Sequence, residues 1–339
     1  MAERAVVFAE RPARRVMITG AAGFIGRHVV QEAARRDVRL RLMAHSRRVP
    51  GTATHRQVVP ADLTDPGALR GVCDDVDVLL HCASHVGGTL ETNEAVNTQG
   101  TRNLLDEARR AGVRRIVYVS TAAVYGRGAF RNATPTRLTR NPGSPTSVTR
   151  ARAEDMVLDA GGTVLRPHLV YGAGDNWLLP GLVRLLHALP ATVEGWTARL
   201  SVIAASDLAR LTVSAGLASA AELTAPVYHA THPDTVTADT LLRAAAAHSA
   251  IPWPHRDLSV AQARSLLADD SRSAHGLEML TSDHWFDGTP LWRDLGLLPG
   301  PAFDGSFTGP GSGTAAGTPG PAVPGSLYPP VDQPAGGGR

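Results

Sequence analysis

The chain has 339 residues, enough to bury a large core and to build one large α/β domain or two smaller ones. Its net charge of +3, from 34 basic and 31 acidic residues, is too small to indicate a nucleic-acid partner. The two cysteines, Cys73 and Cys82, lack metal-ligand spacing and are too few for a disulfide framework, so we expect no metal site and a reducing compartment.

No segment predicts insertion into a membrane or export. The apolar runs fall short of the roughly 20 residues that span a bilayer. Residues 1–12 form an N-terminal extension that contains Glu3 and Glu10 and lacks the apolar centre of a signal peptide. We therefore expect a cytoplasmic protein with no membrane partner.

Residues 14–36 predict a buried strand, a glycine turn and a helix in direct succession. The strand is followed by Gly20, Gly23 and Gly26 at the spacing G-x-x-G-x-x-G, and helical spacing continues from residue 28. Gly20 would permit the tight turn, Gly23 would let a pyrophosphate approach the backbone, and Gly26 would let the helix pack on the strand. The helix N-terminus would then face an anion, which favours a dinucleotide site over a purely structural turn.

The second strand, predicted at residues 38–44, precedes the residues that would reach the adenosine ribose. In a dinucleotide fold an acidic residue here accepts the 2′-hydroxyl of NAD, whereas arginine binds the 2′-phosphate of NADP. Residues 38–60 contain no carboxylate, and Arg47 and Arg48 follow the strand. This pattern favours NADPH, with NADH as the alternative cofactor and a solvated arginine turn as the alternative interpretation.

Further strands are predicted at residues 55–60, 77–84 and 114–120, with a long helical stretch at 91–111. Asp62, after the third strand, could accept a hydrogen bond from an adenine amino group. Small residues after the fourth strand suit the pyrophosphate side of a cofactor. The alternation of strands and helices predicts an α/β fold of Rossmann type, a doubly wound parallel sheet with a smaller C-terminal substrate lobe.

Six sequence blocks follow one another between residues 14 and 220. They are T-G-A-A-G-F-I-G at Thr19, D-L-T-D at Asp62, H-C-A-S at His81, V-N-T-Q-G-T-R-N-L-L at Val96, V-S-T-A-A-V-Y-G at Val119 and L-R-P-H-L-V-Y-G at Leu165. With these blocks the chain resembles the extended short-chain dehydrogenase/reductases, which include nucleotide-sugar epimerases, dehydratases and ketone reductases. The ordered set is far more specific than any single block.

The resemblance implies cofactor contacts from the glycine turn, from the ends of the predicted strands and from the helices that follow them. The implied cofactor-binding residues are Gly20, Ala22, Gly23, Phe24, Ile25, Gly26, His45, Ser46, Arg47, Arg48, Asp62, Leu63, Cys82, Ala83, Ser84, Asn97, Ser120, Arg150 and Pro167.

The catalytic set of this family, a Ser or Thr with a Tyr and a Lys, is only partly matched. By the resemblance, Thr121 takes the hydroxyl position, Thr146 the tyrosine position and Arg150 the lysine position. Threonine is a far weaker acid than a phenol and arginine stays protonated, so this pair cannot relay a proton. Arg150 could still hold the nicotinamide ribose, and Thr121 could still hydrogen-bond a substrate oxygen. Hydride transfer needs only positioning, so the proton is what lacks a donor.

Three replacements for the missing acid remain open. A side chain near the cofactor could donate the proton, and the candidates are His81, His85, Tyr125 and His168, of which His168 follows the Arg-Pro pair beside the nicotinamide. A lone histidine in such a loop is more often a hydrogen-bonded structural group. Water could serve instead, or the substrate could carry its own donor, such as a phenol beside a ketone in an aromatic polyketide.

The chain is expected to divide into a Rossmann domain at residues 13–165, a substrate lobe at 166–299 and a disordered Gly/Pro-rich tail at 300–339 that is dispensable for the chemistry. In the lobe, helices are predicted at 176–189, at 206–219 with Ser206 as its cap, and at 237–248. Large aromatic residues could line an apolar cleft there, although core positions are the more frequent outcome. These residues are Trp196, Trp253, Trp285, Phe286 and Trp292.

The leading hypothesis is an NADPH-dependent ketone reductase whose partner is a bulky small molecule, an aromatic polyketide of the antibiotic type. Within the family, the chain resembles in kind the tyrosine-less simocyclinone ketoreductase type, with Thr121, Thr146, Arg150 and His168 as the catalytic candidates. The alternatives are a nucleotide-sugar epimerase or dehydratase, and a non-catalytic NADP-binding sensor or scaffold. The resemblance is also compatible with a homodimer.

Overall fold

The computed structural model describes residues 13–45, 56–219 and 221–308. Within this part of the chain, the central sheet consists of seven parallel strands: β1 (Arg14–Thr19), β2 (Val38–Ala44), β3 (Arg56–Pro60), β4 (Val78–His81), β5 (Arg115–Val119), β7 (Thr163–Arg166) and β11 (Val227–His229). Their order is β11-β7-β5-β4-β1-β2-β3, so the direction of winding reverses between β1 and β4. Open α/β sheets bind their ligands at such a switch point. The predicted doubly wound parallel sheet is confirmed.

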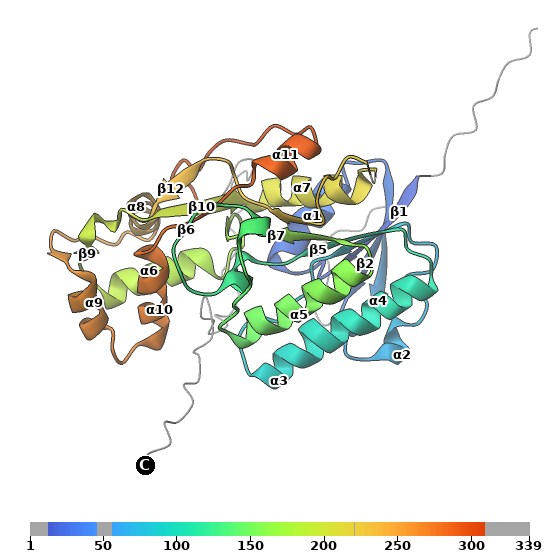
Figure 1. Ribbon diagram of the computed structural model, residues 1–339, viewed down its shortest axis with the longest axis horizontal. Coiled ribbons are helices and arrows are strands. Elements are labelled where there is room, and N and C mark those ends of the chain that lie inside the picture. Colours follow the sequence, from blue (N-terminus) through green and yellow to red (C-terminus); the bar gives the residue numbers. More distant parts are fainter. Residues whose placement is uncertain (1–12, 46–55, 220, 309–339) are drawn as a thin grey trace, which may run out of the picture.

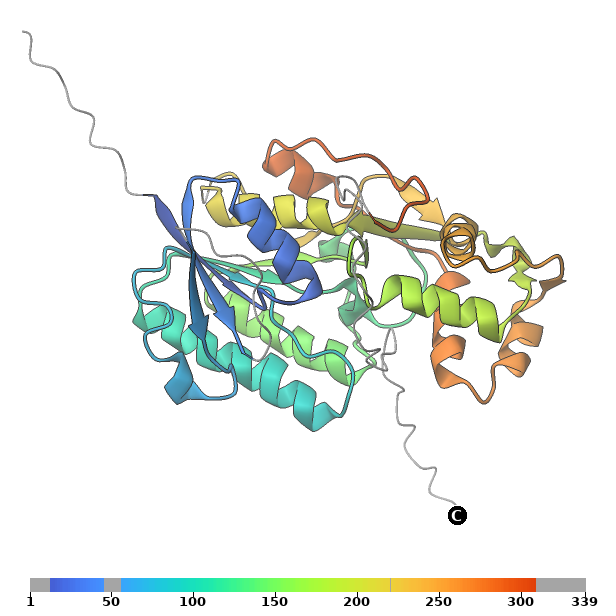
Figure 2. The ribbon, with the colours of Figure 1, turned by 180° about the vertical axis from the view of Figure 1, so that it is seen from behind.

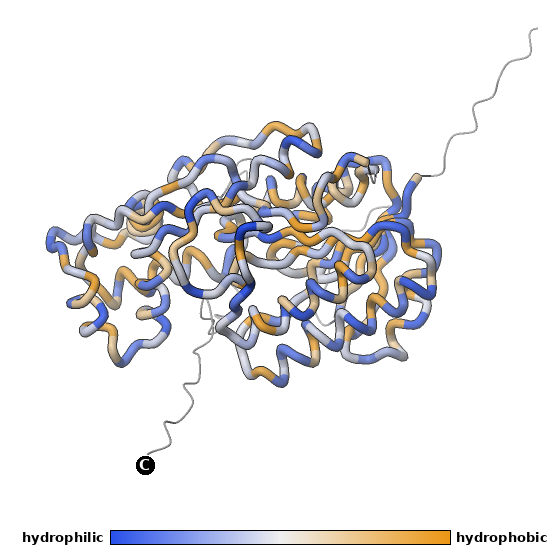
Figure 3. The backbone as a smooth tube through the Cα atoms, viewed as in Figure 1, coloured by the Kyte–Doolittle hydropathy of each residue, from blue (hydrophilic) through white to orange (hydrophobic). Residues whose placement is uncertain are grey.

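Helices cover both faces of this sheet (Figures 1 and 2). One face carries α1 (Phe24–Ala33), α7 (Ala205–Leu217) and α11 (Thr289–Asp294), and the other carries α2 (Pro66–Leu69), α3 (Leu90–Asn93), α4 (Gly100–Arg110) and α5 (Pro145–Asp159). Neighbouring strand residues face opposite sides, so Val16 and Ile18 join the core under α1 and α7 whereas Met17 joins the core under α4 and α5. In Figure 3 the strands are mostly hydrophobic, while hydrophobic and hydrophilic residues alternate along the outer helices.

A second lobe lies at one end of this sheet, on the left in Figure 1. Its strands are β6 (Phe130–Ala133), β8 (Leu169–Tyr171), β10 (Arg199–Ala204), β12 (Thr235–Thr237) and β14 (His284–Phe286), with β9 (Thr192–Val193) paired to β13 (Asp257–Leu258). Its helices are α6 (Leu178–Ala188), α8 (Ala238–His248), α9 (Val260–Leu266) and α10 (Ser271–Leu280). None of the described helices has both the length and the apolar content needed to cross a membrane.

The boundary expected at residue 165 does not separate the two halves. β11 pairs with β7 at the edge of the central sheet, with Tyr228 opposite Leu165, and α7 packs against α1. Conversely, β6 belongs to the second lobe although it precedes residue 165. The apolar side chains of α7 and β11 join the core that covers one face of the central sheet, so the chain returns to the first half after β10.

Residues 300–308, predicted as part of the disordered tail, pack against the rest of the described chain. Phe307 is 3% exposed in the core of the second lobe, and Phe303 packs between it and Tyr171 with ring centroids 5.3 and 5.0 Å away. The amide of Gly300 donates to the Asp207 carboxylate at 3.0 Å. Two phenylalanines are enough apolar surface to order this segment despite its glycines and prolines. Residues 309–339 lie outside the described residues.

Two predicted helices differ in detail from the observed ones. α7 begins directly after β10, so Ala204 occupies the cap position and Ser206 caps nothing. The long stretch predicted at 91–111 is helical throughout, but residues Glu94–Gln99 form a π-helical turn between α3 and α4. A π-turn inserts one residue into the helix and is often found at functional sites.

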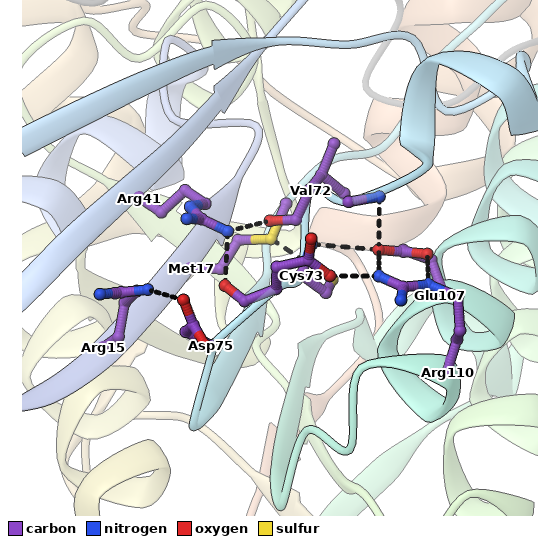
Figure 4. Close-up of polar contacts among 10 residues, drawn as sticks. Arg15, Met17, Arg41, Val72, Cys73, Asp75, Glu107 and Arg110 are labelled. Atoms are coloured by element: carbon purple, nitrogen blue, oxygen red, sulfur yellow. Dashed lines mark hydrogen bonds and ion pairs between the residues drawn. The ribbon is translucent and has the colours of Figure 1, made fainter.

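Buried charged side chains hold the turn that precedes β4 (Figure 4). Glu107 accepts hydrogen bonds from the amides of Gly71 at 2.9 Å and Cys73 at 3.3 Å, and Arg41 donates to the carbonyl oxygen of Val72 at 3.0 Å. Burial raises the pKa of the Cys73 thiol to about 12, so the thiol stays protonated. The turn therefore fixes where β4 enters the sheet, and with it the loop at its carboxyl end.

Candidate functional site

The glycine turn between β1 and α1 has the geometry that its sequence predicts. Gly20 has a φ of 65°, and a side chain on Gly26 would overlap the carbonyl oxygen of Gly20. Gly23 is the N-cap of α1, with no side-chain cap and no acidic residue in the first turn. The amides of that turn can therefore bind an anion, and the positive end of the helix dipole favours it.

Polar side chains meet at the carboxyl ends of β1, β4 and β5. The two ring nitrogens of His81 lie 2.7 Å from Thr19 Oγ1 and 3.0 Å from Thr101 Oγ1. Burial, with a smaller effect from Arg150, lowers the pKa of His81 to about 3, so this ring is neutral. Among the described residues, the buried Ser120 hydroxyl has no hydrogen-bond partner. An unpaired buried hydroxyl at the switch point is suited to a ligand.

On the adenosine side, two of the expected residues contact each other. His45 Nε2 lies 3.3 Å from Asp62 Oδ2, while Asp62 Oδ1 accepts the amide of Thr64 at 2.9 Å. The side chain of Leu63 is buried in the core, which leaves its backbone for the predicted cofactor contact. Ser46, Arg47 and Arg48 lie outside the described residues, so the expected NADP contact stays a prediction.

The remaining predicted cofactor residues lie along the same edge of the sheet. Ala22, Phe24 and Ile25 are in the glycine turn and the first turn of α1, and Cys82, Ala83, Ser84 and Pro167 directly follow β4 and β7. Burial raises the pKa of the Cys82 thiol to about 12. The uncapped helix, the unpaired Ser120 hydroxyl and the close-packed glycines together fit a dinucleotide.

The three residues at the catalytic positions have different surroundings. Thr121 caps the short helix Ala122–Tyr125, where its Oγ1 accepts the amide of Ala123 at 3.1 Å. Thr146 is buried, and its Oγ1 accepts the Gly87 amide at 3.1 Å and donates to Asn93 Oδ1 at 3.0 Å.

The third, Arg150, is buried and donates to the carbonyl oxygen of Val119 at the end of β5. Asn97, expected to bind the cofactor, is 2% exposed and has its amide bonded to protein groups. Arg150 thus keeps a place beside the cofactor edge, whereas Asn97 and Thr146 serve contacts within the protein.

The four candidate acids differ in their surroundings. His81 has both nitrogens paired, as described above. Tyr125 is buried, with its hydroxyl 2.7 Å from His229 Nε2 and 2.7 Å from Arg166 Nη1, and Arg166 forms a two-bond ion pair with Glu154. His85 is partly exposed, and its imidazole lies beside Gly88 in its own loop. The buried polar atoms of His81 and Tyr125 are thus already paired, and neither group is free to reach a substrate carbonyl.

His168 has different surroundings. Both of its ring nitrogens are buried and have no hydrogen-bond partner among the described residues. Burial, with smaller effects from His284 and His229, lowers its pKa well below the usual value, so the ring is neutral. It lies between β7 and β8, nearly parallel to His284 at 5.6 Å and edge-on to Phe286 at 5.3 Å.

A cavity of about 250 Å³ lies between the two halves, beside the end of β5. Residues between 122 and 128 and the N-terminus of α5 contribute to its lining. The lining also includes the rings of Phe130, His168, His284 and Phe286, whose neighbouring centroids are 5.3 to 5.6 Å apart. Its lining residues are Ala122, Ala123, Gly126, Arg127, Gly128, Phe130, Gly143, Ser144, Ser147, His168, Arg264, His275, Glu278, Met279, Ser282, His284 and Phe286. The four clustered rings suit an apolar group, and the charged Arg127, Arg264 and Glu278 also line the cavity.

Sequence reasoning anticipated few of these lining residues. Of the expected aromatic residues, Phe286 faces the cavity, whereas Trp196 and Trp292 are 2% and 3% exposed in the two cores. Phe130 and His284 carry no sequence signal, because they meet through a parallel pairing of two short strands distant in the chain. The i, i+4 spacing of Asn93 and Asn97 could have indicated a shared helix face.

Comparison with known proteins agrees with this geometry. A sterol-4-alpha-carboxylate 3-dehydrogenase of Saccharomyces cerevisiae is 32% identical over 49% of this chain and 54% of its own length. A 4-hydroxy-2-methyl-3-oxo-4-farnesyl-3,4-dihydroquinoline-1-oxide ketoreductase of Stigmatella aurantiaca is 30% identical over 50% of this chain and 54% of its own length. The chain thus spans about half the length of these relatives.

The fold is also that of a solved enzyme, WbmG of Bordetella bronchiseptica in complex with NAD. The two chains superpose with a TM-score of 0.69 over 89% of this chain and 94% of that one, at 18% identity. The model of the NAD dependent epimerase/dehydratase family matches residues 16–228, from β1 to β11. The glycine turn, the switch-point edge and the catalytic positions all fall within this match, and the chain therefore belongs to the NAD dependent epimerase/dehydratase family.

Proposed function

We propose that this protein is an NADPH-dependent ketone reductase that acts on a bulky aromatic substrate of the polyketide type, without a tyrosine as acid. One observation carries the proposal: the hydroxyl at the tyrosine position, on Thr146, is bonded to Asn93 and Gly87. The rings in the cavity at the N-terminus of α5 support an aromatic substrate. The names of the two relatives above, a dehydrogenase of a sterol acid and a reductase of a farnesylated quinoline ketone, support a large apolar substrate.

The residues present would position the reactants. The uncapped N-terminus of α1 would hold the pyrophosphate, and Arg150 would hold the nicotinamide ribose at the end of β5. The cofactor, when bound, supplies the hydride. Thr121 uses its oxygen to accept the Ala123 amide, so its hydroxyl hydrogen can be donated to the ketone oxygen.

The substrate would neutralise its own alkoxide through a phenol beside the ketone. A neutral His168 could add a hydrogen bond to the same oxygen, since its buried ring nitrogens have no partner among the described residues. A ring whose pKa lies well below its usual value does not titrate near neutral pH, so the rate should show no break from His168 between about pH 6 and 8.

The preference for NADPH rests on the sequence after β2. Residues 38–60 contain no carboxylate to accept the 2′-hydroxyl of NAD, and Arg47 and Arg48 could pair with a 2′-phosphate. The NAD in the WbmG structure is a property of that protein.

The test follows NADPH absorbance with a polycyclic ketone that carries an adjacent phenol and with its methyl ether, which has the same rings but no acidic proton. We expect the methyl ether to react about 100-fold more slowly, which is the contribution of a general acid. His168→Phe should retain turnover of the phenolic ketone to within about tenfold. Equal rates for the two ketones, together with loss of activity in His168→Phe, would place the acid on the protein.

The alternatives give different results in the same assays. Turnover of a nucleotide sugar by protein with copurified NAD would restore the epimerase or dehydratase hypothesis. Cofactor binding without hydride transfer to any ketone, together with a specific protein partner, would favour a sensor or scaffold.

A further inference from the structure

The loop that leaves β4, residues 82–89, is held by four buried polar side chains. They are Asn93, Asn97, Thr146 and Thr149, with exposed fractions of 0%, 2%, 6% and 0%. The asparagines lie on α3 and the π-helical turn, and the threonines lie on α5. We call these four residues the amide–threonine cluster.

The cluster binds the backbone of the loop at three residues. Asn97 accepts the His85 amide at 2.7 Å and donates to the His85 carbonyl at 2.9 Å. Asn93 donates to the carbonyls of Gly87 at 2.6 Å and Thr89 at 2.8 Å, and Thr146 accepts the Gly87 amide at 3.1 Å. The Thr146 hydroxyl hydrogen then goes to Asn93 Oδ1 at 3.0 Å. The backbone amide and carbonyl of both His85 and Gly87 are thus satisfied by side chains.

This loop needs such support because of its own composition. Gly87 and Gly88 have φ values of 83° and 73°, and glycine loses the most conformational entropy when it is ordered. The loop follows β4 at the switch point of the sheet, beside the edge where the dinucleotide would lie. If the loop became ordered only when the cofactor binds, the loss of conformational entropy would lower the affinity for the cofactor. A loop that is already ordered avoids this cost.

We propose that Thr146 is a positioning residue: its hydroxyl, together with Asn93, fixes Gly87 and so holds the loop as a preformed wall of the cofactor cleft. The position that carries an acidic phenol in the resembled family would here carry a structural hydroxyl. The inference rests on the proposed function, in which the bound cofactor reduces a ketone. Its test measures cofactor binding alone.

The test measures the affinity of the purified full chain for NADPH and NADH by fluorescence titration, using the cofactor that the wild type binds more tightly. Thr146→Val keeps the shape but removes the hydroxyl, which leaves the buried Gly87 amide unpaired, and we expect affinity to fall about tenfold. Thr146→Ser restores the hydroxyl and should bind to within about twofold of the wild type. Thr146→Tyr loses the bond to Gly87 and should bind no better than Thr146→Val.

The matched control is Thr212→Val on α7, which removes another fully buried hydroxyl, one that donates to the Leu208 carbonyl at 2.7 Å away from the loop. It should lower the thermal midpoint but leave cofactor affinity unchanged, whereas a general loss of stability would affect both variants alike. The inference would be overturned by unchanged cofactor affinity in Thr146→Val, or by equal losses of affinity in Thr146→Ser and Thr146→Val. It would also be overturned if Thr146→Tyr bound the cofactor more tightly than Thr146→Val, or if the wild type bound neither cofactor. Binding behaviour as expected without ketone turnover would refute the proposed function alone.

Discussion

Replacement of Gly26 by alanine is expected to abolish cofactor binding at working concentrations. An added methyl group would overlap the carbonyl oxygen of Gly20, a backbone atom that cannot rotate away, and would force α1 off β1. Such overpacking costs about 3 kcal/mol, which corresponds to roughly 100-fold in affinity if the cost falls on the bound state. Thermal unfolding without NADPH measures the stability of the variant. Unfolding with NADPH then shows whether the cofactor binds, because a bound ligand raises the unfolding midpoint.

The control for this substitution is Gly276→Ala on α10. A methyl group there would make only an ordinary contact with Leu185 at 3.9 Å, and alanine is favoured over glycine inside a helix by about 1 kcal/mol. This variant should keep the cofactor-dependent rise in midpoint. If Gly26→Ala bound NADPH as the wild type does, the packing of α1 on the turn would not define the pyrophosphate site.

A chain that ends at Pro299 is expected to be largely unfolded or aggregated, whereas a chain that ends at Thr308 should be as stable as the full protein. The shorter chain loses Phe303 and Phe307 and the bond from the Gly300 amide to Asp207. Full burial of a phenylalanine contributes about 1.5–3 kcal/mol; Phe307 is buried and Phe303 partly buried. The empty site also exposes an apolar wall, so the sum approaches the lower end of the 5–15 kcal/mol that roughly bounds domain stability. Urea unfolding and size-exclusion chromatography separate the two outcomes.

A second comparison isolates the aromatic contribution. Phe303→Ala combined with Phe307→Ala in the full chain should reproduce most of the loss, because it removes the same rings and keeps the backbone bond at Gly300. If the chain ending at Pro299 unfolded at the same urea concentration as the full chain, residues 300–308 would be as dispensable as their composition first indicated.

The cofactor half follows closely from the sequence because its signals are local. The strand at residues 38–44 was predicted at its observed bounds, and the turn from Gly20 to Gly26 depends on residues that neighbour one another in the chain. Glycine spacing and apolar runs encode such units directly.

The rest of the fold and of the candidate site depends on contacts between distant segments, which local sequence patterns do not encode. β11 is three residues long, so no periodicity distinguishes it from a loop, and its place in the sheet follows from pairing with β7. The bonds of Thr146 to Asn93 and Gly87 join three segments, and only the fold brings them together. The sequence could show that a phenol was missing, but not what the threonine does in its place.

The pairing of β6 with β14 makes the ring-lined cavity a late product of folding. Phe130 and His284 are neighbours in this pairing, so the chain must close a very long loop before this part of the cavity exists. Such distant contacts form slowly, and during synthesis the ribosome must release the chain beyond residue 286 before it can assemble. A nascent chain from which β14 has not yet emerged therefore cannot hold a hydrophobic guest between the rings of Phe130 and His284.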